Sequence, residues 1–133
     1  MRLLIYLIAM TGVATPVFAE TPASFLAAYA SQARQENPAF NVPSASRGQQ
    51  FFKESHGKEW SCASCHTQTP TSSGKHQVTG KRIEPLAPAA NAERFTSERK
   101  VEKWFKRNCG DVLDRNCTAQ EKGDVLAYLL SMR

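Results

Sequence analysis

The sequence has little that could cross a membrane and no pattern typical of nucleic-acid binding. One long apolar run occurs, Leu3 to Ala14, and it is too short to span a bilayer comfortably. No comparable run follows, so we expect the rest of the chain to be soluble. No basic stripe interleaved with aromatic residues is visible, so no nucleic-acid partner is expected. Methionine is also scarce, and only Met132 lies beyond residue 10.

Residues 1–19 have the layout of a cleaved signal peptide. Arg2 supplies the positive charge, the apolar run follows, and Val17-Phe18-Ala19 is a small-residue cleavage site. Cleavage would give a mature chain that begins at Glu20 and is exported to the periplasm; an uncleaved anchor is the alternative. Loss of Arg2 lowers the formal net charge of +5 by one. The remaining excess either favours an acidic partner or serves solubility.

Two of the four cysteines form a Cys-x-x-Cys-His motif, Cys62 to His66, which is the attachment site of a c-type haem. Thiols at this spacing can add to two vinyl groups of one porphyrin, and the adjacent imidazole can bind the iron. A zinc site would need a second ligand pair, and a thioredoxin-like site a βαβ pattern. Neither is visible. We therefore predict one covalent haem c held by Cys62 and Cys65, with His66 as proximal iron ligand.

The other two cysteines, Cys109 and Cys117, are an even pair in a chain that we expect to be exported. Disulfides form and persist in such oxidising compartments. We therefore predict a disulfide between them, with two free thiols as the alternative.

Helical periodicity recurs along the chain and predicts an all-α fold. Gly48, in the middle of one expected helix, costs about 1 kcal/mol there and usually marks close passage of another helix. Thr118 to Glu121 is a capping box that opens the last helix. The expected helices cover Thr21 to Gln35, Ser46 to Glu54, Thr96 to Asn108, and the residues after Thr118.

The expected helix from Thr96 to Asn108 combines an apolar face with several cations. Val101, Trp104 and Phe105 have the spacing of a buried face, and Thr96 is a plausible N-cap. The cations Lys103, Lys106 and Arg107 fall near the predicted C-terminus, where positive charge suits the helix dipole.

The stretch from Thr67 to Pro88 is rich in proline and glycine and has little regular signal. We expect this long irregular loop to wrap the haem edge. Its cations are either partners for the haem propionates or solvated charges. They are Lys75, Lys81 and Arg82.

This arrangement resembles class I cytochrome c. That family carries Gly-x-x-x-aromatic in its first helix, as at Gly48 and Phe52, and an aromatic residue among aliphatic ones in its last, as in Leu126-Ala127-Tyr128-Leu129. It packs these helices across each other at the glycine. The resemblance covers residues 44–133, the expected haem domain. With the signal peptide (1–19), this leaves residues 20–43 as an extra N-terminal helical extension.

The sixth ligand departs from the ordinary family, which uses a methionine on a loop before the last helix. We interpret Met132, two residues from the end, as core packing. The other candidates are His76 in the wrapping loop, a lysine, Asn108, or no sixth ligand at all. His56 lies on the same side of the attachment motif as His66 and would need a long detour.

A narrower resemblance covers most of the mature chain. Segments 37–40, 80–88, 103–109 and 116–124 are similar to the small, high-spin, oxygen-binding cytochromes c, the SHP family. There, an asparagine directly before a disulfide cysteine is the distal ligand. The matching position is Asn108, before Cys109; Asn116 also precedes a cysteine, at the start of the last helix. An amide oxygen is a hard donor that prefers Fe(III), so the resemblance implies release on reduction and binding of O₂, NO or CO.

Three functions follow from these observations. The first is an electron-transfer cytochrome whose reduced haem binds a diatomic gas. The family resemblance implies a dihaem cytochrome c or a membrane cytochrome b as redox partner. The second is a plain low-spin electron shuttle with His76 or Met132 as sixth ligand. The third is a peroxidase or nitric-oxide-detoxifying enzyme, ranked last because no distal His–Arg pair can be placed.

Overall fold

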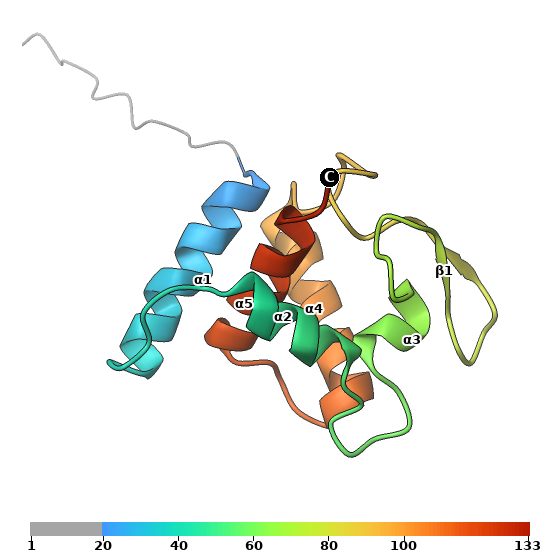
Figure 1. Cartoon of the computed structure of the whole chain (residues 1–133), viewed down its shortest axis with the longest axis horizontal. Helices are drawn as coiled ribbons and strands as arrows, with labels where there is room; N and C mark the ends of the chain where they lie inside the picture. The colour runs from blue at the N-terminus through green and yellow to red at the C-terminus, as the bar shows by residue number, and fades with distance from the viewer. Residues whose placement is uncertain (1–19) are drawn as a thin grey trace, which may run out of the picture.

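The computed structural model describes residues 20–133, and the predicted signal peptide, residues 1–19, lies outside them. In the described part, helices carry the fold, and the predicted all-α class is confirmed (Figure 1). No helix among these residues is long and apolar enough to cross a membrane. The elements are α1 (Pro22–Glu36), α2 (Ala45–Lys53), α3 (Cys62–His66), β1 (Gly74–Lys75), β2 (Arg82–Ile83), α4 (Glu98–Leu113) and α5 (Ala119–Leu130).

Helices α2 and α5 cross in contact at Gly48, as the sequence predicts. A methyl group on Gly48 would overlap the backbone carbonyl of Asp124, so only glycine lets the two backbones approach this closely. The Asp124 side chain is buried. Its carboxylate accepts hydrogen bonds from the Arg47 guanidinium at 2.8 Å and from the Ser44 backbone N–H at 2.6 Å. These contacts bind the start of α2 to the middle of α5.

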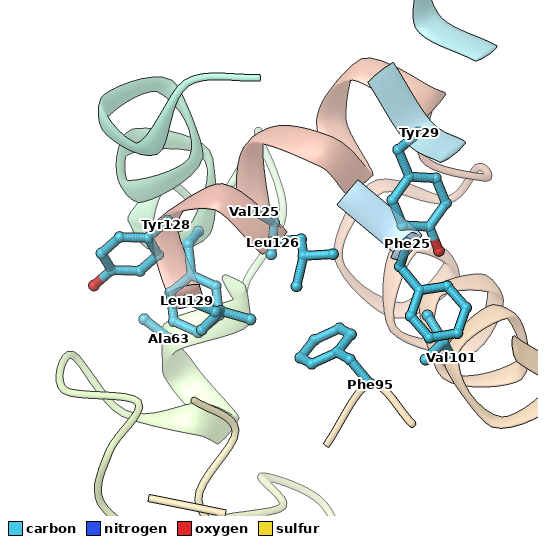
Figure 2. Packing of buried hydrophobic residues seen from close by; sticks show 10 residues of the cluster. Phe25, Tyr29, Ala63, Phe95, Val101, Val125, Leu126, Tyr128 and Leu129 are labelled. Carbon is cyan, nitrogen blue, oxygen red and sulfur yellow. The ribbon is translucent and has the colours of Figure 1, made fainter. Parts of the chain in front are cut away.

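The main hydrophobic core surrounds α5. Leu126 and Leu129 are completely buried, and Figure 2 shows Leu126 between the cluster around Tyr128 and the residues contributed by α1 and α4. Helix α1 joins this core through Phe25 and Tyr29. Met132 packs against the same cluster, which agrees with its interpretation as a packing residue.

The N-terminal helix α1 is also tied to the other helices by polar contacts. The Tyr29 hydroxyl donates to Glu102 of α4 at 2.6 Å, and Lys122 of α5 donates to the same carboxylate at 2.6 Å. Glu36 accepts a hydrogen bond from the Ala119 backbone N–H at the start of α5. The extension is therefore fixed to both C-terminal helices.

Helix α4 corrects two details of the sequence analysis. Its N-cap is Ser97, and the Thr96 hydroxyl instead donates to the Glu93 carbonyl. The helix continues past Asn108 to Leu113 and ends at Asp114, whose backbone is left-handed. Val112 lies two helical turns after Phe105 and so extends the same buried face. Its burial favours continuation of the helix through Gly110.

The connection from α4 to α5 is closed by the predicted disulfide between Cys109 and Cys117. Both cysteines are buried. The predicted capping box is present, with the Thr118 hydroxyl accepting from the Glu121 backbone N–H and the Glu121 carboxylate accepting from the Thr118 N–H. Arg115 pairs with the same carboxylate at 2.7 Å. The start of α5 is thus fixed to the last turns of α4.

We predict that Gly48→Ala lowers the free energy of unfolding by about 1–3 kcal/mol, because the added methyl group must push α2 away from α5. Gly110→Ala is the matched control, since a methyl group there meets nothing within 4 Å. That control should raise stability by up to about 1 kcal/mol. Chemical denaturation of both variants measures the difference, and equal effects would contradict the close crossing.

Replacement of Cys109 and Cys117 by alanine should lower the free energy of unfolding by about 2–3 kcal/mol, because the bridge closes a short loop in the unfolded chain. Chemical denaturation without reductant compares the variant with the wild type. A thiol reductant should then destabilise only the wild type. A wild-type unfolding midpoint that does not respond to complete reduction would contradict this prediction.

Candidate functional site

The attachment motif forms the short helix α3. Ser61 caps it: the Ser61 hydroxyl accepts from the Ser64 backbone N–H, and the Ser64 hydroxyl accepts from the Ser61 N–H. Residues three and four apart in a helix share a face. Cys62, Cys65 and His66 are therefore held together on one turn, as a motif that binds one porphyrin requires.

His66 lies in a mostly apolar environment without a side-chain hydrogen bond to any residue in 20–133. Its Nδ1 atom is buried and unpartnered within that range, and the Phe52 ring of α2 lies 6.4 Å away, centroid to centroid. Burial, with a smaller effect of the nearby Arg94 charge, lowers the pKa of His66 to about 4. The imidazole is therefore neutral and has a free nitrogen lone pair for a metal.

The two motif cysteines do not resemble a redox-active pair. Neither takes part in a disulfide, and burial raises the pKa of the Cys62 thiol to about 11. Reactive Cys-x-x-Cys pairs instead have lowered thiol pKa values. Within residues 20–133, no cluster of histidine, cysteine and acidic side chains has the arrangement of a separate metal site.

A small hairpin, β1 and β2, packs against α3 and was missed in the sequence analysis. A methyl group on Gly74 would overlap the Cys65 carbonyl, and the Gln77 amide donates to the Ser64 carbonyl. Gly74 and Gly80, with its positive φ of 67°, were the available signals for a close contact and a turn. The hairpin therefore holds the backbone of the attachment motif in place.

The loop cations proposed for the propionates lie on this hairpin. Lys75, Lys81 and Arg82 are all exposed. Arg82 is already engaged, with Glu84 at 3.0 Å and the Ser73 hydroxyl at 2.8 Å. The three side chains therefore do not share a common partner in the structure.

Arg94, which was not singled out from the sequence, is the cation whose charge acts on His66. It is half-buried and donates to the carbonyls of Pro85 and Glu84 at 2.9 and 2.7 Å. In the sequence, the aromatic residue next to it, Phe95, could have indicated that this segment packs against the core, where Phe95 is buried. Arg94 fixes the end of the wrapping segment and places a positive charge near His66.

The two other histidines are engaged in local contacts. His56 shares a hydrogen bond of 2.7 Å with the Phe51 carbonyl and packs on the Phe51 ring. His76 lies at the hairpin turn, where its Nδ1 accepts from the N–H groups of Val78 and Thr79. His76 is therefore on the segment that packs against α3.

Asn108 lies within α4, five residues before the helix ends, and not at its terminus as the sequence analysis expected. It is half-buried, and its side-chain amide makes no hydrogen bond to any residue in 20–133. The next residue, Cys109, is buried and bonded to Cys117. Asn116, the other asparagine before a cysteine, is exposed.

The residues present fit haem c. One short turn offers two unoxidised thiols and a neutral, buried imidazole whose Nδ1 lacks a partner among the described residues. Buried polar atoms are normally hydrogen-bonded. Such an imidazole, without a hydrogen bond among the described residues, is suited to bind a metal ion. Together with the crossing of α2 and α5 at Gly48, this turn defines a c-type cytochrome.

Comparison with known proteins agrees. The chain belongs to the family described as a domain of unknown function, DUF1924, whose model matches residues 38–129. It is also similar to proteins named cytochrome c'' and SHP. It is 46% identical to cytochrome c'' of Methylophilus methylotrophus over 107 residues, covering 77% of this chain and 74% of that protein. It is 41% identical to the cytochrome c-type protein SHP of Cereibacter sphaeroides over 130 residues, covering 93% and 95%.

Solved structures show the same fold. Oxidised cytochrome c'' of Methylophilus methylotrophus superposes with a TM-score of 0.75 at 42% identity, covering 84% of this chain and 94% of that one. Oxidised SHP, described as an oxygen-binding cytochrome c, also gives 0.75, at 39% identity, covering 86% and 100%. The expected class I cytochrome c fold with an added N-terminal helix is thereby confirmed.

We predict that the double variant Cys62→Ala/Cys65→Ala loses the haem-bearing band on a denaturing gel, because no thiol remains to form a thioether. The control is Cys109→Ala/Cys117→Ala, which removes the other two cysteines and should keep the band. A band that persists in the first variant would show that the haem is not attached at this motif.

Proposed function

We propose that this protein is a periplasmic, monohaem c-type cytochrome that transfers electrons and binds a diatomic gas when reduced. When bound, haem c supplies a one-electron redox centre and, in the ferrous state, a binding position for O₂, NO or CO. The observation that carries the second half of the proposal is Asn108, a half-buried amide without a hydrogen-bond partner in residues 20–133, fixed beside a disulfide.

On the proximal side, the protein's task is to hold the haem and one ligand. Thioether bonds from Cys62 and Cys65 would make loss of the haem impossible without breaking covalent bonds. His66 would supply a neutral imidazole nitrogen as one iron ligand. Phe52 and the hairpin restrict the movement of the ring and its backbone.

On the distal side, the task falls to Asn108. An amide oxygen is a hard and weak donor, which suits Fe(III) better than Fe(II). Its helix is anchored by the neighbouring disulfide, so the side chain is presented from a rigid backbone. Among the relatives, SHP is described as oxygen-binding, and a solution structure of cytochrome c'' concerns haem-ligand detachment.

The alternative is a plain low-spin shuttle with His76 or Met132 as sixth ligand. His76 is held in the hairpin turn beside α3, the helix that carries His66. Met132 packs against the main hydrophobic core. Both side chains are already engaged in other contacts, whereas the Asn108 amide has no hydrogen-bond partner in residues 20–133, so we rank this alternative second.

We predict that the ferric wild-type protein is high-spin and that the reduced protein binds CO readily. Asn108→Ala should alter the ferric absorption spectrum and leave CO binding to the reduced protein almost unchanged, because the ligand is already absent in that state. Asn108→His should give a low-spin ferric spectrum, because imidazole is the stronger ligand, and should block CO.

Asn116→Ala is the matched control, since it removes the exposed asparagine that precedes the other cysteine of the bridge. It should leave the ferric spectrum unchanged. A low-spin wild-type spectrum that does not respond to Asn108→Ala would eliminate the amide as ligand and would favour His76.

A further inference from the structure

Unpaired positive charges are concentrated on α4. Its cations in the stretch 99–107 are all exposed, and none makes a hydrogen bond or ion pair with any residue in 20–133. They are Arg99, Lys100, Lys103, Lys106 and Arg107. Within the same range, the cations on other elements that also lack an oxygen partner are scattered. They are Lys53, Lys75, Lys81 and Arg133.

The helix dipole does not account for these charges. A helix that ended at Asn108 would have these cations near its C-terminus, but α4 runs on to Leu113 and has no basic residue in its last turn. Their spacing instead places Arg99, Lys103 and Lys106 on one face, with Lys100 and Arg107 beside it. The one acidic residue inside this stretch, Glu102, is occupied by Tyr29 and Lys122.

An exposed tryptophan lies at the edge of this face. Trp104 remains 46% exposed, which makes it one of the few large apolar side chains at the surface of the described residues. Lys103 Nζ and Arg107 Cζ lie 5.6 and 5.8 Å from its ring centroid. Trp104 is one helical turn before Asn108, so both side chains project from neighbouring positions on α4.

The opposite edge of the face is hollowed. A cavity of about 420 Å³ opens between α1, α4 and α5, and Lys103, Lys106 and Lys122 all line it. Of its lining residues, Glu102 is acidic, and its carboxylate is already hydrogen-bonded. A carboxylate side chain of a bound protein would find free ammonium groups there.

We propose that this face of α4, the α4 basic face (Arg99, Lys100, Lys103, Trp104, Lys106 and Arg107), is the docking surface for an acidic redox protein. This inference rests on the proposed function, because it adds the site of electron exchange. Clustered charge of one sign steers an oppositely charged partner and sets the association rate. Tryptophan and arginine, which lie together here as Trp104 and Arg107, are residues enriched at the energetically important centres of interfaces. Docking here would place the partner one helical turn from Asn108.

The test uses an acidic [2Fe–2S] ferredoxin as probe. Binding of the oxidised ferredoxin to the ferric holoprotein is measured by calorimetry at low and high salt. Transfer of one electron from the reduced ferredoxin to the ferric haem is measured by stopped flow. For Lys103→Glu/Arg107→Glu, we expect the dissociation constant to rise and the electron-transfer rate to fall by about 10-fold or more at low salt. Most of the salt dependence of binding should also be lost in this variant.

The matched control is Lys75→Glu/Lys81→Glu, the same change of charge on two unpaired lysines of the hairpin. It should change affinity by less than about threefold. Equal losses in the two variants would mean steering by net charge only, and a larger loss in the control would place docking at the hairpin. Either result overturns the proposal.

Further measurements keep the proposal falsifiable if a charge-reversed variant does not fold. Trp104→Ala, which keeps every charge, should weaken binding while the salt dependence stays as in the wild type. Wild-type binding that does not weaken with salt would overturn the proposal, as would tighter binding to anionic lipid vesicles or to duplex DNA. Calorimetric binding does not depend on the sixth ligand, so a failure of the Asn108 assignment would be distinguishable.

Discussion

The close crossing of α2 and α5 at Gly48 determines where the haem-binding turn lies. A side chain at Gly48 would overlap the Asp124 carbonyl, and the Asp124 carboxylate in turn binds the backbone and side chain at the start of α2. At the other end of α2, Phe52 is buried against the Tyr128 ring of α5 and lies near His66. The position of His66 therefore depends on a contact eighteen residues earlier in the chain, through a helix too short to be stable by itself.

Features that depend on local chemistry could be predicted from the sequence. The Cys62–His66 motif, the Thr118 capping box and the close approach at Gly48 each follow from residues within a few positions of one another. The end of α4 could not be placed so easily. Gly110 and the cysteine pair suggest a helix stop near Asn108, but burial of Val112 extends the helix to Leu113. Tertiary packing overrode the local preference.

The hairpin was missed for a related reason. Its two strands have two residues each, too few for an alternating pattern. The hairpin is held by its contact with α3, through Gly74 and Gln77. Local propensities do not reveal this contact, because they describe each segment of the chain separately. The same applies to the cations. Composition alone shows a modest positive excess, whereas the structure separates the cations paired on other elements from those left free on α4.

If Asn108 binds the iron as proposed, the greater length of α4 changes what its release would require. At a helix end, the ligand could leave by fraying of the last turn, at small cost. Asn108 instead has a further turn of helix after it, and the next residue is bonded to Cys117. Local unfolding at this point would have to break helical hydrogen bonds beside a covalent link. Release would then proceed by rotation of the Asn108 side chain or by a small tilt of α4 as a unit. A tilt would move Trp104 and its neighbouring cations as well, since they belong to the same rigid helix.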